Sequence, residues 1–172
     1  MNFLSNLSIN TRAWMLLTLS ALTLEASALY FQYVMGLAPC IMCIYQRTAL
    51  WAICIGGVIG CLGNKLLLGR IIAYSLWAVG AIWGLVIAIE HVEIQNAAFS
   101  FMYSCEFVPN FPTWAPLHEW LPMLFEANGD CGDIDWQFLG QSMPQMMIVV
   151  FGIYSLILCL ALVTRLLKTK MV

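Results

Sequence analysis

The chain has 172 residues, of which 62% are hydrophobic and 9% are charged. This composition excludes a soluble globular domain and is typical of an integral membrane protein. The 7 basic and 9 acidic residues give a net charge of −2. No basic stripe with interleaved aromatic residues is present, so nucleic acid is not a predicted partner.

Four apolar runs each approach the ~20 residues that a helix needs to cross a lipid bilayer. They predict membrane-spanning helices at residues 13–34, 44–62, 71–89 and 145–164. The first run is too long for the apolar core of a signal peptide and lacks a convincing cleavage site, so we expect a retained helix. The predicted fold is an all-α integral membrane protein, in which residues 1–172 form a single membrane domain built as an antiparallel four-helix transmembrane bundle.

The basic residues predict which side of the membrane each loop faces. All of them except Arg47 lie before the first span, between the second and third spans, or after the fourth: Arg12, Lys65, Arg70, Arg165, Lys168 and Lys170. The loops at 35–43 and 90–144 contain no Lys or Arg. By the positive-inside rule, both termini face the cytoplasm and these two loops face the outside.

The first predicted span carries an acidic residue and ends close to the second span. Glu25 lies deep in this span. A neutral, hydrogen-bonded carboxyl group and a carboxylate that balances Arg47 both fit the sequence. The connection at 35–39 is short, which predicts a tight antiparallel hairpin and holds Cys40 at the membrane surface.

A Cys-x-x-Cys motif, Cys40-Ile41-Met42-Cys43, stands at the entrance of the second span, directly after Pro39. Arg47 follows one turn later on the same helix face. A cation inside the membrane is costly and is usually functional or paired, although a side chain at this shallow depth can also snorkel to the interface. The helix dipole and Arg47 both favour a thiolate in this motif.

The third predicted span contains two spaced glycines and ends at a histidine. Gly80 and Gly84 have the spacing of a helix-dimer motif, but packing inside the bundle is the preferred interpretation. His91 lies at a depth similar to that of Arg47, because the second and third spans run in opposite directions. Such a histidine is often only a polar interfacial residue. Beside a dithiol and an arginine, it is a candidate to donate a hydrogen bond or relay protons to a lipid-soluble acceptor with carbonyl oxygens.

The outer segment at 90–144 has the composition of a loop domain. Several prolines forbid a long regular helix in it: Pro109, Pro112, Pro116 and Pro122. The pattern at 114–125 predicts a short helix that lies in the membrane interface. Asn128-Gly129-Asp130 predicts a turn directly before Cys131.

The cysteines separate into two groups by their place in the chain. Those within spans are expected to be buried apolar residues: Cys54, Cys61 and Cys159. Those predicted to face the outside are Cys40, Cys43, Cys105 and Cys131. Thiols in an oxidising compartment do not stay reduced, so two disulfides are expected. Of the three possible pairings, the close spacing favours Cys40 with Cys43, which leaves Cys105 with Cys131.

Three interpretations of the Cys-x-x-Cys motif compete. As a structural staple it would close so short a ring that it would stabilise the fold little. A metal site would need two further ligands nearby, and exposure to a disulfide-forming compartment disfavours it. A redox role is favoured, because the motif lies where its thiolate is stabilised. Two electrons that leave a dithiol need an acceptor, and the sequence contains no haem, flavin or iron–sulfur motif.

Taken together, these residues belong to an ordered set of motifs that covers nearly the whole chain. The set comprises Ala13-Trp14, Leu24-Glu25, Pro39-Cys40-x-x-Cys43-Ile44-Tyr45-x-Arg47, Glu90-His91, Cys105-x-Phe107, Phe111-Pro112-x-Trp114, Gly129-x-Cys131, Trp136-x-Phe138-Leu139-Gly140 and Met143-Pro144-Gln145. With four predicted spans, it closely resembles the DsbB family of bacterial inner-membrane quinone reductases. A Cys-x-x-Cys motif alone is weak, but the ordered set is specific.

The resemblance implies a multi-pass protein of the bacterial inner membrane that reoxidises a periplasmic DsbA-type thiol oxidase. A thiolate of this partner attacks the Cys105–Cys131 disulfide at Cys105. The leaving thiolate of Cys131 then passes the electrons to Cys40–Cys43.

The same resemblance implies the final acceptor. Cys43 donates the electrons to ubiquinone, or to menaquinone under anaerobic conditions. Arg47 matches the family's quinone-site arginine and His91 its quinone-proximal histidine. The implied partners are therefore the thiol oxidase, the membrane quinone pool and the lipid bilayer.

Other readings of the sequence stay open beside this one. Gln46 stands where an acidic residue is common in the family, which leaves the dithiol potential undetermined. A paralogous branch with a dedicated thiol oxidase is also compatible. The vitamin K epoxide reductase type is disfavoured, because its loop cysteines precede the Cys-x-x-Cys motif in the chain. The alternative outside enzymes is a four-span scaffold with a disulfide-stapled outer loop.

Overall fold

The structure of the protein is a computed structural model that describes residues 10–97 and 108–169. Its four long helices are α2 (Thr11–Tyr33), α3 (Ile41–Gly63), α4 (Leu67–Ala97) and α7 (Met143–Thr169). Each is long and apolar enough to cross a membrane. The predicted all-α, four-helix membrane fold is confirmed.

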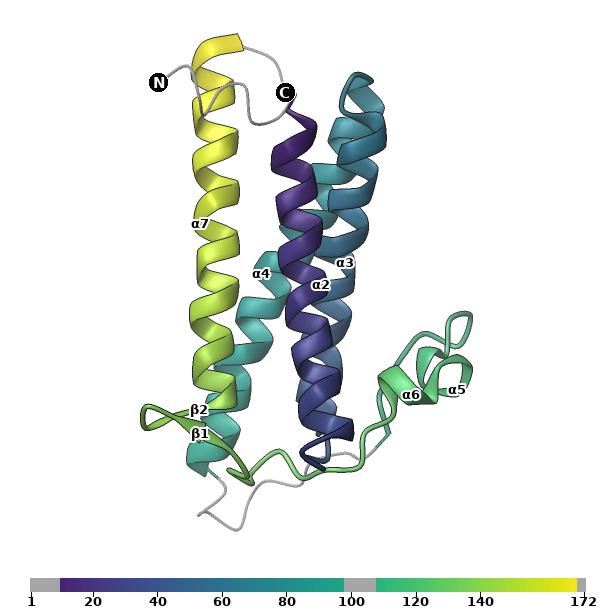
Figure 1. Cartoon of the computed structure of the whole chain (residues 1–172), viewed down its shortest axis with the longest axis vertical. Helices are drawn as coiled ribbons and strands as arrows, with labels where there is room; N and C mark the ends of the chain where they lie inside the picture. Colours follow the sequence, from purple (N-terminus) through teal and green to yellow (C-terminus); the bar gives the residue numbers. More distant parts are fainter. Residues whose placement is uncertain (1–9, 98–107, 170–172) are drawn as a thin grey trace.

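The four helices form one elongated bundle (Figure 1). Helix α3 packs against both α2 and α4, and α4 packs against α7. Helix α2 begins and α7 ends at the same end of the bundle, whereas the segment with the short helices lies at the opposite end (Figure 1). We refer to this opposite end, where α3 begins and α4 ends, as the loop end.

Gly80 and Gly84 allow close packing within the bundle, as predicted from the sequence. A Cβ atom on Gly80 would meet the Ala49 carbonyl oxygen and Ile53 of α3, and one on Gly84 would overlap the Phe151 ring of α7. The two glycines therefore allow α4 to approach two neighbouring helices closely.

Helix α4 is longer than the predicted span, which ended at residue 89, and continues to Ala97. The polar residues after 89 mark the end of the apolar run, but they do not end the helix. Since α4 continues for about two turns beyond that point, His91 lies within the helix rather than at its end. The helical backbone around residue 91 therefore fixes the direction in which the His91 side chain points.

The outer segment holds two short helices where the sequence predicted one. Helices α5 (Leu117–Trp120) and α6 (Pro122–Phe125) are separated at Leu121, whose φ of −135° and ψ of 64° are not helical. The prediction of one helix at 114–125 was wrong because Pro122 lacks an N–H donor and its ring disfavours a helical residue before it. Pro122 instead occupies the first position of α6.

A small hairpin precedes the last helix and was not predicted. Strands β1 (Gln137–Phe138) and β2 (Gln141–Ser142) pair antiparallel. They are joined by Leu139 and Gly140, whose φ angles are 52° and 77°. Positive φ at both turn positions is the geometry that joins two strands by a two-residue turn.

Candidate functional site

The Cys-x-x-Cys motif forms the start of α3. Cys40 is the N-cap residue, with an extended backbone, and its sulfur accepts a hydrogen bond from the Cys43 N–H at 3.3 Å. This contact satisfies one of the backbone donors that the first turn of a helix leaves open. The motif therefore starts the helix and at the same time fixes the two sulfur atoms next to each other.

The structure shows this pair as a dithiol, whereas the sequence predicted a disulfide between the two cysteines. Cys40 and Cys43 are free, and their Sγ atoms lie 2.8 Å apart. The hydrogen bond with Cys43 raises the pKa of the Cys40 thiol above its ordinary value, and burial raises it further. Cys40 therefore keeps its proton, and Cys43 is the thiol that gives up its proton when the pair ionises.

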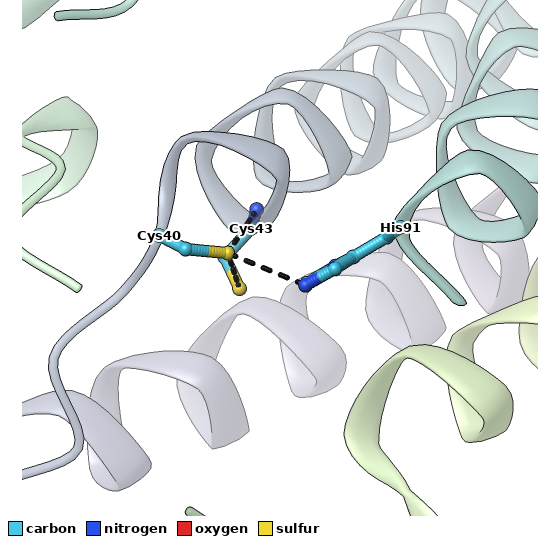
Figure 2. Close-up of side chains that lie close together, drawn as sticks. All are labelled: Cys40, Cys43 and His91. Atoms are coloured by element: carbon cyan, nitrogen blue, oxygen red, sulfur yellow. Dashed lines mark hydrogen bonds between the residues drawn. The ribbon is translucent and has the colours of Figure 1, made fainter. Parts of the chain in front are cut away.

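His91 reaches the motif from the neighbouring helix. Its side chain points from α4 toward the sulfur of Cys40 (Figure 2), with Nε2 3.5 Å from Sγ. On the other side of the ring, Nδ1 lies 3.3 Å from the Gln46 amide nitrogen. His91 and Gln46 are only 3% and 4% exposed, so the ring is fixed between a sulfur atom and an amide.

Arg47 lies one turn below the dithiol and is held from several elements. Its Nη1 donates to Gln32 Oε1 of α2 at 2.9 Å and to the Leu124 carbonyl oxygen of α6 at 2.6 Å. Its Nε lies 3.2 Å from Glu25 Oε1. Arg47 is 5% exposed, so it does not snorkel to the surface, and of the two roles open to Glu25 the structure favours charge balance.

Cys131 is disulfide-bonded and completely buried. It packs in the same apolar cluster as Cys40, Ile41 and Phe125. Its predicted partner, Cys105, lies outside the described residues, so the pairing with Cys105 stays a prediction. Of the six predicted site residues, the structure brings together the five that it describes.

A short backbone contact fixes the segment before Cys131 to the segment before Cys40. The N–H groups of Asn128 and Gly129 donate to the Pro39 carbonyl oxygen at 2.9 and 3.1 Å. A Cβ atom on Gly129 would overlap the Ala38 carbonyl oxygen, so glycine permits this close approach. The predicted turn at 128–130 is thus where the outer segment docks beside the dithiol.

A cavity of about 120 Å³ connects these groups at the loop end. Its site residues are Cys40, Cys43, Gln46, Arg47 and His91. Apolar side chains form much of the remaining wall, including Phe31, Leu50 and Met147, and carboxylates from the outer segment complete it: Asp130, Asp133 and Asp135. A dithiol, a cation and an imidazole thus share one largely apolar cavity.

Comparisons with known proteins identify the family. The family model described as "Disulfide bond formation protein DsbB" matches residues 10–161. The chain belongs to the DsbB family. It is 55% identical over 170 residues, 99% of each chain, to the disulfide bond formation protein B of Pseudoalteromonas atlantica. The corresponding proteins of Pseudoalteromonas translucida and Shewanella loihica are 50% and 45% identical, again over 99% of each chain.

Membership of the DsbB family establishes the general activity. The chain is a multi-pass membrane protein of disulfide bond formation and a disulfide-generating oxidoreductase. The resemblance inferred from the ordered motifs is confirmed. The scaffold alternative is not supported by this membership.

Two glutamines of this DsbB-family site were not predicted as site residues. Gln46 was noted only as a departure from an acidic residue, yet it holds the His91 ring. Gln32, at the end of the first span, accepts from Arg47. A signal for both was present, because an amide within or beside an apolar span needs a hydrogen-bond partner. The sequence could not show which partner each amide has.

Proposed function

We propose that the protein is a protein-disulfide:quinone oxidoreductase of the bacterial inner membrane, with both termini in the cytoplasm. It reoxidises a periplasmic DsbA-type thiol oxidase through Cys105–Cys131 and passes the electrons through Cys40–Cys43 to ubiquinone or menaquinone. The observation that carries the proposal is the dithiol that shares one cavity with Arg47 and His91.

The first exchange takes place at the outer segment. A thiolate of the reduced partner attacks Cys105, the Cys105–Cys131 bond breaks, and Cys131 leaves as a thiolate. The partner's second thiolate then attacks the mixed disulfide, which leaves the partner oxidised and Cys105 and Cys131 reduced. The buried position of Cys131 inside the apolar cluster protects its thiolate from competing thiols.

The second exchange carries the electrons to the membrane surface. The Cys131 thiolate attacks Cys40 in the Cys40–Cys43 disulfide, so that Cys43 leaves as a thiolate. The Cys105 thiolate then attacks Cys131 in the Cys40–Cys131 mixed disulfide, which re-forms Cys105–Cys131 and leaves Cys40 and Cys43 reduced. The shared cluster of Cys131 and Cys40 supports this step. The proton affinity of Cys40, raised by its hydrogen bond and by burial, agrees with Cys43 as the thiolate that faces the acceptor.

The cavity suits a lipid-soluble quinone, because it offers a hydrogen-bond donor for a carbonyl oxygen and apolar walls for the ring. A bound quinone supplies a two-electron, two-proton acceptor. Arg47 would hold one of its carbonyl oxygens: the contacts described for Arg47 engage Nε and Nη1, which leaves the Nη2 hydrogens to donate. The apolar side chains of Phe31, Leu50 and Met147 would cover the ring.

His91 donates a hydrogen bond to the sulfur of Cys40. The Gln46 amide nitrogen donates to Nδ1, so Nδ1 is unprotonated and Nε2 carries the hydrogen of the neutral ring. That hydrogen faces the Cys40 sulfur at 3.5 Å. When Cys40 and Cys43 are oxidised, two electrons and two protons leave the pair, and the Nε2–H group of His91 is placed to donate a hydrogen bond that stabilises negative charge on the Cys40 sulfur.

The state of the cysteines in cells that lack quinone tests this proposal. If the electrons leave through quinone, both cysteine pairs accumulate as thiols in such cells and react with an alkylating reagent. Cells with quinone serve as the control, and the variant that lacks Cys54, Cys61 and Cys159 should give the same pattern. If both disulfides stay closed without quinone, they are static staples and the proposed electron path is wrong.

A further inference from the structure

The reduced dithiol and His91 form a constellation that the proposed electron transfer does not account for. Cys40 Sγ, Cys43 Sγ and one ring nitrogen of His91 all lie within 4.8 Å of one another. A metal site needs two ligands besides the two cysteines, and His91 is placed to be the first of them. We propose that the reduced centre binds a thiophilic divalent cation, Zn²⁺ or Cd²⁺, through these three residues and is thereby held in the dithiol form.

The geometry of the three ligand atoms suits a tetrahedral ion. With Zn–S near 2.3 Å and Zn–N near 2.0 Å, the ligand atoms of a tetrahedral site lie roughly 3.5–3.8 Å apart. Nε2 of His91 is already 3.5 Å from the sulfur of Cys40. The two sulfur atoms, 2.8 Å apart, must separate by about 1 Å to bind the ion, which a small rotation of either side chain provides.

The surroundings of the site favour a cation with one open position. Three protein ligands leave the fourth tetrahedral position to a water molecule from the cavity. Asp130, Asp133 and Asp135 line the same cavity, and their carboxylates raise the local concentration of cations. The opposing charge of Arg47 is balanced by Glu25, 3.2 Å away.

Gln46 supports the imidazole in the metal-bound form as well. A histidine that binds a metal through Nε2 carries its hydrogen on Nδ1 and donates it to a neighbouring acceptor. The Gln46 amide lies 3.3 Å from Nδ1 and contains both a donor and an acceptor. Rotation of the amide by half a turn therefore presents its oxygen to the Nδ1 hydrogen.

Binding is controlled by the oxidation state of the centre. In the reduced form each S–H bond is replaced by a bond from sulfur to the metal, so two protons are released and no electron is transferred. In the oxidised form the two sulfur atoms are bonded to each other and offer no thiolate. The bound ion prevents the S–S bond from forming again. That this would stop disulfide generation rests on the proposed function, but binding itself does not.

Metal titration of the full chain tests the proposal without quinone or thiol partner. The protein, with Cys105 and Cys131 replaced by Ser, is reduced in detergent, freed of reductant without oxygen, and titrated with Co²⁺ and with Zn²⁺ against a chromogenic chelator. We expect an equimolar amount of ion to bind with thiolate-to-Co²⁺ absorption, and the same polypeptide oxidised to its Cys40–Cys43 disulfide to bind none.

Substitution of a proposed ligand can be compared with substitution of the same residue type elsewhere in the chain. Loss of a hydrogen bond to a metal ligand typically weakens binding 10–100-fold, so His91→Ala should weaken it by at least about tenfold. His118→Ala and the joint replacement of Cys54, Cys61 and Cys159 by Ser should leave the affinity unchanged. The proposal is overturned if the oxidised protein binds equally, if His91→Ala has no effect, or if the reduced protein binds no ion. Each of these results would leave the proposed electron transfer standing.

Discussion

At the scale of single residues, the site depends on two buried polar side chains, each held by a partner on a neighbouring helix. Arg47 is held by Glu25 and Gln32 of α2, and His91 by Gln46 of α3. A buried charge or imidazole with a fixed partner has a defined position and protonation state.

The ion pair of Glu25 and Arg47 should be strongly coupled. Both side chains are nearly completely buried, so Glu25→Leu leaves an uncompensated charge and should lower the free energy of unfolding by about 3 kcal/mol. Glu25→Leu combined with Arg47→Met should recover most of this loss, since no buried charge remains. Denaturation in detergent measures the double-mutant cycle. Additive effects of the two replacements would contradict the pairing.

The tautomer of His91 should depend on the amide of Gln46. The wild-type ring should carry its hydrogen on Nε2, because Gln46 donates to Nδ1. In Gln46→Glu the ionised carboxylate can only accept hydrogen bonds. The His91 ring should therefore carry a hydrogen on Nδ1, either alone or together with one on Nε2. Imidazole ¹⁵N chemical shifts report this directly, and His118→Ala assigns the signal. An Nδ1-protonated ring in the wild type would refute the hydrogen bond from Nε2 to the Cys40 sulfur.

At the scale of elements, the site is formed where the start of α3, the last turns of α4 and the outer segment meet. Tyr33 Oη donates to the Met123 carbonyl oxygen at 2.7 Å, and the Asn110 N–H donates to Tyr45 Oη at 2.9 Å. These contacts anchor the outer segment on α2 and α3. The position of Cys131 relative to Cys40 follows from this anchoring together with the docking at Pro39.

Docking of the outer segment should control electron transfer between the two cysteine pairs. Gly129→Val places a side chain against the Ala38 carbonyl oxygen and displaces the segment before Cys131. A displacement of about 1 Å can slow an exchange by up to ~10²-fold. After reduced partner is added, rapid acid quenching and alkylation should find Cys105 and Cys131 reduced while Cys40 and Cys43 stay oxidised.

A matched glycine controls for the added side chain itself. Gly152 of α7 has no atom within 4 Å of a built Cβ, so Gly152→Val should transfer electrons at the wild-type rate. If Gly129→Val transferred them equally fast, the docking of the outer segment would have no part in the relay.

The sequence predicted the helices better than it predicted their contacts. Long apolar runs are visible in one sequence, because a bilayer requires them. The polar end of α4 was assigned to a loop, because hydropathy marks the membrane boundary and not the end of the helix. Contact between His91 and Cys40 depends on two separate helices, and only their similar depth was predictable. The turn at Leu139 was missed because leucine rarely adopts a positive φ.

At the scale of the whole molecule, the redox site lies at one end of the helix bundle. Among the described residues, Arg12, Lys65, Arg70 and Arg165 lie toward the other end of the bundle, while Asp130, Asp133 and Asp135 line the cavity at the loop end. This separation agrees with the orientation expected from the positive-inside rule.

Labelling of introduced cysteines should reveal this orientation. Leu139 is 86% exposed on the hairpin, and Lys65 is exposed between α3 and α4. In a background without native cysteines, a membrane-impermeant maleimide should label Leu139→Cys in cells whose outer membrane alone is permeable. Lys65→Cys should react only after the inner membrane is opened. Labelling of Lys65→Cys in cells with an intact inner membrane would contradict this orientation and indicate the opposite one.

The central claim is that electrons from a thiol partner leave through Cys40 and Cys43 to quinone beside Arg47. Stopped-flow absorbance of purified protein with ubiquinone and a reduced DsbA-type partner tests it most directly. We expect quinone to disappear mole for mole with partner disulfide. This loss should be abolished when Cys40, Cys43, Cys105 or Cys131 is replaced, and slowed on the order of 10²-fold in Arg47→Ala, which loses a fixed hydrogen-bond donor. Quinone that stays unchanged while the partner is oxidised, or that is consumed without these cysteines, would contradict the account.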